Sequence, residues 1–146
     1  MAQGQREIGG FTMILNAVIE NLPRVLAFVD ESLERRACPT RVQMQIDIAV
    51  EEIFVNIASY AYKPMMGPAE ILIQEDHDPE GITITFIDSG VPYDPLAKPD
   101  PDISLSASER QIGGLGIYMV KKSMTDMQYR YEGGRNILTI RKEFAQ

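Results

Sequence analysis

Hydrophobic patterning constrains the fold of this 146-residue chain more than any other feature. Segments whose apolar residues alternate predict strands, and segments whose apolar residues recur every three or four positions predict helices. Their order along the chain is strand, helix, helix, strand, strand, long loop, helix, strand, strand, which lacks the strict alternation of a doubly wound sheet. The pattern therefore predicts an α+β two-layer sandwich, with a mixed, mostly antiparallel sheet and helices on one face.

The expected elements form one domain over residues 1–146, with a core at about 10–144. Strands are expected at 11–15, 70–75, 82–88, 127–131 and around 138–140, and helices at 20–36, at 40–62 with Thr40 as cap, and from the glycines near 114 to 127. Residues 76–81 are expected to form a hairpin turn. Residues 91–112 contain four prolines and predict a long loop, which in a compact domain is typical of a lid.

Charge and composition exclude several classes of protein. The formal charge of −7 argues against a nucleic-acid partner, because phosphate binding needs a basic surface, and it favours a protein partner instead. No apolar run approaches the roughly 18 residues of a membrane span, so we expect no membrane association. Cys38 is the single cysteine and forms no internal disulfide, and the first residues do not resemble a signal peptide. We therefore expect a cytoplasmic protein.

Two polar residues four positions apart mark the second expected helix. Glu52 and Asn56 project along one edge of this helix, beside its apolar stripe. A carboxylate there could accept a proton from an attacking hydroxyl, and an amide oxygen is a ligand suited to Mg²⁺. The same spacing also occurs on solvated helix edges.

An acidic residue ends the strand expected at 82–88. Asp88 shares its parity with apolar Ile84 and Phe86, so its carboxylate should point to the buried face. There it could accept a hydrogen bond from the amino group of an adenine, and Gly90 would let the backbone approach a flat ligand closely. A simple Asp-Ser-Gly turn is the alternative.

A glycine cluster opens the third expected helix. Gly113, Gly114 and Gly116 would place unpaired N–H groups at the positive end of a helix dipole, which favours phosphate. Arg110, in the expected lid, could reach a terminal phosphate, although a solvated lid charge is equally consistent. A packing role for the glycines stays open. His77 and the pair Lys121 and Lys122 are expected to be solvated residues without a role in chemistry.

Together, three segments resemble the motifs of one known family. They are Glu52-Ile-Phe-Val-Asn56, Asp88-Ser-Gly-Val-Pro-Tyr-Asp-Pro95 and Gly113-Gly-Leu-Gly-Ile-Tyr-Met-Val120, with a Gly-Arg-Asn run ending at Asn136. Over roughly residues 10–144 the chain resembles the anti-sigma-factor serine/threonine kinases, a single-domain branch of the histidine-kinase-like ATPase superfamily.

The resemblance implies a function and a set of roles. It implies ATP and Mg²⁺ as cofactors, with Glu52 as general base, Asn56 as Mg²⁺ ligand and Asp88 reading adenine beside Gly90. The residues implied to lie along the phosphates are Arg110, Gly113, Gly114, Leu115 and Gly116. It also implies phosphorylation of an anti-anti-sigma (STAS-type) protein, sequestration of a sigma factor, and a homodimer. The alternative is a non-catalytic nucleotide-binding module that acts by sequestering a regulator.

Overall fold

The computed structural model describes residues 4–7, 10–97 and 114–145, which form a sheet covered by helices on one face. The sheet has the order β1-β2-β3-β4-β6-β5. Its strands are β1 (Gly4–Glu7), β2 (Gly10–Asn16), β3 (Pro68–His77), β4 (Glu80–Asp88), β5 (Asp126–Glu132) and β6 (Arg135–Glu143). All five pairings between these strands are antiparallel. The predicted α+β two-layer fold is confirmed, while the sheet, expected to be mixed, is antiparallel throughout the described part.

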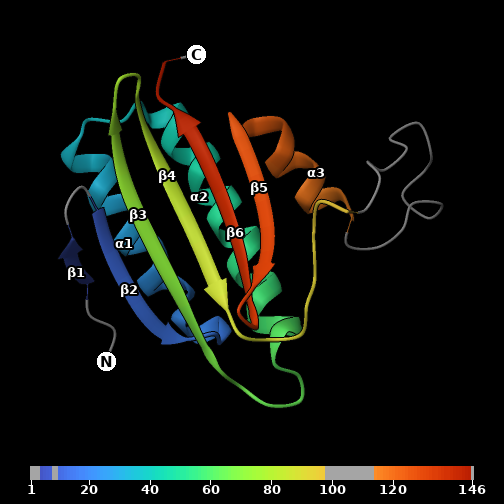
Figure 1. Cartoon of the computed structure of the whole chain (residues 1–146). Helices are drawn as coiled ribbons and strands as arrows, with labels where there is room; N and C mark the ends of the chain where they lie inside the picture. Colours follow the sequence, from blue (N-terminus) through green and yellow to red (C-terminus); the bar gives the residue numbers. More distant parts are fainter. Residues whose placement is uncertain (1–3, 8–9, 98–113, 146) are drawn as a thin grey trace.

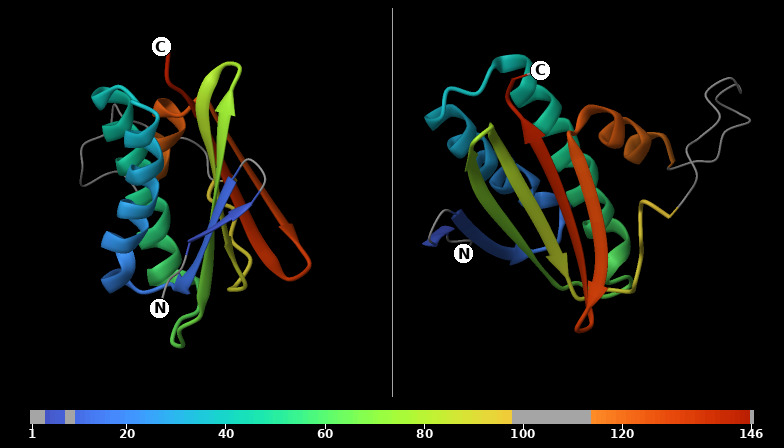
Figure 2. Two further views of the ribbon diagram at one scale, coloured as in Figure 1. Left: turned by 90° about the vertical axis from the view of Figure 1, so that its left-hand side faces the viewer. Right: turned by 45° about the horizontal axis from the view of Figure 1, so that its top comes forward.

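The helical layer lies entirely on one side of the sheet, as the left view of Figure 2 shows. Its helices are α1 (Leu22–Arg35), α2 (Thr40–Asn56) and α3 (Gly114–Ser123), with a 3₁₀ turn at Ile19–Asn21 and a π-helical turn, η2, at Ile57–Ala61. No helix in the described ranges is both long and apolar enough to cross a membrane.

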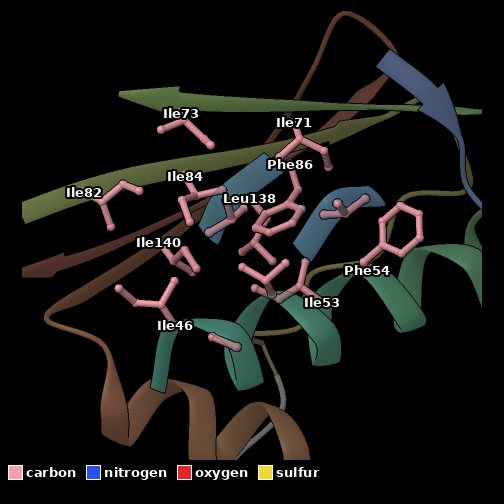
Figure 3. Packing of buried hydrophobic residues seen from close by; sticks show 14 of the residues in the cluster. Ile46, Ile53, Phe54, Ile71, Ile73, Ile82, Ile84, Phe86, Leu138 and Ile140 are labelled. Atoms are coloured by element: carbon pink, nitrogen blue, oxygen red, sulfur yellow. The ribbon is translucent and has the colours of Figure 1, made fainter. Parts of the chain in front are cut away.

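The core forms where the sheet meets α2. Alternate residues of β3, β4 and β6 point toward the helices, among them Ile71, Ile84, Phe86 and Ile140. They pack near Ile53 and other apolar residues of α2 (Figure 3). Burial of each such side chain contributes about 1.5–3 kcal/mol, so this layer dominates the stability of the fold.

Four local expectations differ from the structure. The β3–β4 hairpin turn is shorter than expected, because the strands stay paired to His77 and Glu80 and leave only two residues between them. Met127 belongs to β5 and not to the third helix, which ends at Ser123. Thr40 is the first residue of α2 and does not cap it, since Pro39 occupies the cap position. The edge strand β1 was not predicted.

An ion pair fastens α1 to the sheet. Glu75 of β3 accepts hydrogen bonds from the Ser32 hydroxyl at 2.9 Å and the Arg35 guanidinium at 2.6 Å. Burial by itself would raise the pKa of Glu75, but these two donors outweigh it and the pKa is lowered. The contact therefore favours the ionised carboxylate.

A second polar contact fastens the end of α3 to β6. The Lys142 side chain is only 2% exposed, and its ammonium donates to the carbonyl oxygen of Ser123 at 2.6 Å. Burial, together with the positive charge of Arg41, lowers the pKa of Lys142. A cation at this carbonyl also complements the negative end of the α3 dipole.

Two carboxyl groups meet between α1 and α2. Burial raises the pKa of Asp47 to about 8, assisted by a hydrogen bond to Asp30 and by the negative charges of Asp30 and Glu34. The Asp47 carboxyl therefore keeps its proton near neutral pH. The pair therefore lowers the free energy of unfolding, and increasingly so as the pH rises.

Candidate nucleotide-binding site

Glu52 and Asn56 lie together on the last turns of α2, as their spacing predicts. The Asn56 side-chain amide donates to Oε2 of Glu52 at 3.2 Å, and both side chains are half-buried. Asn56 lines a cavity between α2, the sheet and the segment that follows β4. Glu52 itself is not among the residues that line the cavity, and its hydrogen bond to Asn56 connects its carboxylate to the cavity wall.

Asp88 stands in the wall of the same cavity. It ends β4, is 6% exposed and, as its parity with Ile84 and Phe86 predicts, points to the helical face. One of its oxygens, Oδ1, accepts the backbone N–H of Gly90 at 2.9 Å. A buried carboxylate needs such donors, and a ligand amino group would serve as a further one.

Gly90 is held against the π-helical turn η2. The following amide, Val91 N–H, donates to the Ala61 carbonyl at 2.9 Å, and a Cβ added at Gly90 would lie 2.6 Å from the Cβ of Ala61. Only glycine permits this approach. Short π-helical turns are frequent at functional sites. Here η2 supplies Ile57, Tyr60 and Ala61 to the cavity wall.

Gly116 brings the third segment to the same place. It lies in the first turn of α3, where a Cβ would lie 2.5 Å from Oε2 of Glu52. α3 therefore packs so closely on the Glu52 carboxylate that any larger residue at position 116 would displace it. Its neighbour Ile117 lines the cavity, so α3 forms one of its walls.

The cavity has a volume of about 150 Å³ and a mostly apolar lining with few polar groups. Its walls include Ile53, Ile57, Phe86, Ile117 and Leu138, with Asn56, Asp88 and Asn136 as polar members. Apolar cavities of about this size admit a small aromatic ring. An apolar space with a carboxylate in its wall fits an aromatic base that carries an amino group.

Four other predicted residues are not among the described residues that line the cavity. Gly114 is the first residue of α3, at the end where N–H groups lack partners within the helix. The Leu115 side chain is 42% exposed and does not belong to the cavity lining. Arg110 and Gly113 lie outside the described residues, as does most of the expected lid at 91–112.

Asn136 is the polar residue of the site whose importance the sequence did not reveal. It is 7% exposed in β6, and its amide donates to Asp88 Oδ1 at 2.9 Å and to the Val91 carbonyl at 2.9 Å. Its side-chain oxygen accepts from the Tyr93 amide at 3.1 Å and from the Tyr129 hydroxyl. The position of Asn136 in the Gly-Arg-Asn run was the available signal.

The Tyr129 hydroxyl is kept in its donating form. Burial raises its pKa despite the nearby backbone of Tyr93, and the negative charges of Asp94 and Asp88 add to the effect. Tyr129 is therefore protonated at physiological pH and remains a hydrogen-bond donor to Asn136.

Comparison with family models matches residues 15–142 to the model described as the histidine kinase-like ATPase domain. The chain belongs to this ATPase family. Members of the family use ATP, which agrees with the apolar cavity and its carboxylate.

Curated relatives within this ATPase family are kinases by name. The chain is 24% identical over 134 residues to the serine/threonine-protein kinase BtrW of Bordetella bronchiseptica, covering 92% of this chain and 94% of the relative. It is 32% identical over 97 residues to the serine-protein kinase RsbW of Bacillus cereus, covering 62% of this chain and 58% of the relative. The resemblance to anti-sigma-factor serine/threonine kinases is confirmed.

A solved structure shares the fold of this ATPase domain. A chain in the crystal structure of the SiaB-SiaC complex from Pseudomonas aeruginosa superposes with a TM-score of 0.57 at 14% identity, over 88% of each chain. At this identity the likeness concerns the fold.

Proposed function

We propose that this protein is an ATP-dependent protein-serine/threonine kinase that phosphorylates a small anti-anti-sigma protein of the STAS type. When it is not acting on that substrate, it sequesters a sigma factor, and it works as a homodimer. One observation carries the proposal. Asn56 of α2 and Asp88 of β4 line one cavity, and Gly116 of α3 packs on the Glu52 carboxylate that binds Asn56.

The described residues fit Mg-ATP at this cavity. Asp88 would accept the adenine amino group in the apolar space, with Gly90 shaping the wall beside it. The amide of Asn56 would provide one oxygen ligand to Mg²⁺, which prefers few protein ligands together with phosphates and waters. The N–H groups at the start of α3, from Gly114 to Gly116, would lie along the phosphates. Arg110 and Gly113 remain part of the proposal as further phosphate contacts.

Glu52 is the residue that moves a proton in this proposal. When bound, ATP supplies the γ-phosphoryl group, and Mg²⁺ neutralises its charge. Oxygen Oε2 of Glu52 is already engaged by the Asn56 amide, which holds the carboxylate in place. Glu52 would then accept the proton of the substrate serine or threonine hydroxyl as the hydroxyl oxygen bonds to the γ-phosphorus, while the bond from that phosphorus to ADP breaks and ADP leaves.

Two variants with a matched control test these roles. Glu52→Gln should retain Mg-ATP binding and lose phosphoryl transfer, whereas Asp88→Asn should lose binding, because an amide presents both an acceptor and a competing donor to the base. Glu51→Gln removes an exposed carboxylate on the same helix and serves as the control for transfer. Binding is measured by calorimetry, and transfer by the mass gain of one phosphate on candidate anti-anti-sigma proteins.

The outcomes separate the kinase from a passive binder. If the unmodified protein binds Mg-ATP and transfers nothing to any anti-anti-sigma protein of its own cell, the non-catalytic module replaces the kinase. If it binds no nucleotide at millimolar concentration, both are wrong. Co-purification of a sigma factor, lost when the anti-anti-sigma protein is added, tests sequestration, and light scattering tests the dimer.

A further inference from the structure

The buried side-chain amide of Asn136 makes every hydrogen bond that it can make. A side-chain amide offers two N–H donors and an oxygen with two lone pairs. In this structure the donors reach Asp88 and Val91, and the oxygen receives Tyr93 and Tyr129. A buried polar group satisfied on every side holds its neighbours in one arrangement.

The orientation of the Asn136 amide is fixed by groups that cannot exchange roles. The Tyr93 backbone N–H can only donate, and the Val91 backbone carbonyl can only accept. Reversal of the amide would set an N–H against an N–H and an oxygen against an oxygen. The group that faces Asp88 is therefore an N–H donor.

This donor determines how the Asp88 carboxylate is turned. Oδ1 of Asp88 accepts both from Asn136 and from the backbone of Gly90, each at 2.9 Å. Within the described part of the chain, no hydrogen bond reaches the other oxygen, Oδ2. Because Asp88 lines the cavity, the two donors commit one oxygen to the protein and leave the other to a ligand.

We infer that Asn136 is a positioning residue for base selectivity, which acts through Asp88. The inference rests on the proposed nucleotide-binding function and extends it. A fixed carboxylate oxygen accepts the 6-amino group of adenine and repels the 6-oxo group of hypoxanthine. If Asn136 no longer holds Oδ1, the carboxylate can rotate away, and discrimination between the two bases falls.

Binding of Mg-ATP and Mg-ITP measures this discrimination, because the bases differ at the 6-position that the carboxylate faces. Asn136→Asp keeps an oxygen for Tyr93 and Tyr129 but replaces the donor to Asp88 with an oxygen. Asn136→Ser removes the amide without adding charge. Thr139→Val is the control, since it breaks the Thr85–Thr139 hydroxyl bond at 3.2 Å between the same strands, away from the cavity lining.

The unmodified protein and Thr139→Val should prefer ATP to ITP by about 100-fold, which is the effect of one hydrogen bond to a charged group that adenine can make and hypoxanthine cannot. In both Asn136 variants the ratio of ATP affinity to ITP affinity should fall at least about tenfold, because each variant loses the hydrogen bond that Asn136 donates to the charged Asp88 carboxylate. A general loss of fold, or added charge in Asn136→Asp, would weaken both nucleotides alike and leave the ratio unchanged. Circular dichroism and melting curves establish that each variant is folded.

The possible failures are distinguishable. If the unmodified protein prefers ATP and both Asn136 variants keep the full preference, the inference is wrong and the proposed function stands. If neither variant folds, Asn136 serves the structure alone and the inference is equally overturned. If the unmodified protein binds neither nucleotide, the proposed function fails and the inference fails with it.

Discussion

Gly116→Ala is the most informative single substitution, because it separates the stability of the fold from the placement of the proposed base. The new Cβ would lie 2.5 Å from Oε2 of Glu52, whereas ordinary van der Waals contact begins at 3.4 Å. The carboxylate must therefore move by about 1 Å. The obstructing atoms belong to the end of a flexible side chain, so the movement itself costs little.

Stability and activity should change in opposite directions. Alanine is more favourable than glycine within a helix by about 1 kcal/mol, so Gly116→Ala should melt at the same temperature as the unmodified protein or higher. A displacement of about 1 Å at a reacting group costs on the order of 100-fold in rate. We expect a loss of this size in the rate of phosphoryl transfer at saturating Mg-ATP.

A double-mutant cycle tests whether the loss passes through Glu52. Transfer is measured in single turnovers for Gly116→Ala, for Glu52→Gln and for the double variant, and nucleotide binding is measured for each. If Gly116→Ala acts by displacing the carboxylate, the double variant should be no slower than Glu52→Gln alone, because residues acting as a unit are not additive. Additive losses, or loss of Mg-ATP binding in Gly116→Ala, would refute this reasoning and assign Gly116 directly to the phosphates.

Three further predictions concern the contacts between the layers. Asp47→Asn should stabilise the protein at pH 8 but not below about pH 4. The pKa of Asp47 is raised to about 8 in the folded state, so between about pH 4 and pH 8 the folded protein binds more protons than the unfolded chain. The free energy of unfolding therefore falls as the pH rises through this range, and the asparagine variant lacks this loss. Melting curves across this range check it, with Glu31→Gln, which removes an exposed carboxylate of α1, as the matched variant for comparison. Glu75→Gln should lower the free energy of unfolding, measured in urea at pH 7, by about 1 kcal/mol. The lowered pKa of Glu75 stabilises the fold only while its carboxylate is ionised. The difference in unfolding free energy between the two proteins should therefore shrink as the pH falls below the ordinary range of a glutamate. Lys142→Met should cost about 1–3 kcal/mol because the buried Ser123 carbonyl loses its donor, and an unchanged urea midpoint would contradict this.

Local periodicity predicted the parts of the site that lie within one element. The spacing of Glu52 and Asn56 predicted a shared helix edge, and the two side chains are hydrogen-bonded. The alternation around Phe86 predicted that Asp88 points to the buried face, and it does. In both cases the geometry of a helix or strand alone fixes the direction of the side chain.

Features that depend on how separate segments pair could not be predicted from local sequence patterns. Asn136 meets Asp88 because β6 pairs with β4 in one register, which no local pattern specifies. The hairpin turn was expected at 76–81 because its residues are polar, yet cross-strand pairs extend β3 to His77. Met127 fits both a helical and a strand pattern, and only the end of α3 at Ser123 decides between them.

The buried lysine of β6 that contacts the carboxyl end of α3 affects how this helix can move. Lys142 holds the carboxyl end of this helix to the sheet by a hydrogen bond, whereas near its opposite end Gly116 lies against the end of the flexible Glu52 side chain. A helix that is held at one terminus can be displaced most at the other terminus. Any strain arising beside the cavity is therefore expected to tilt α3 about Ser123, with the largest excursion at Gly114.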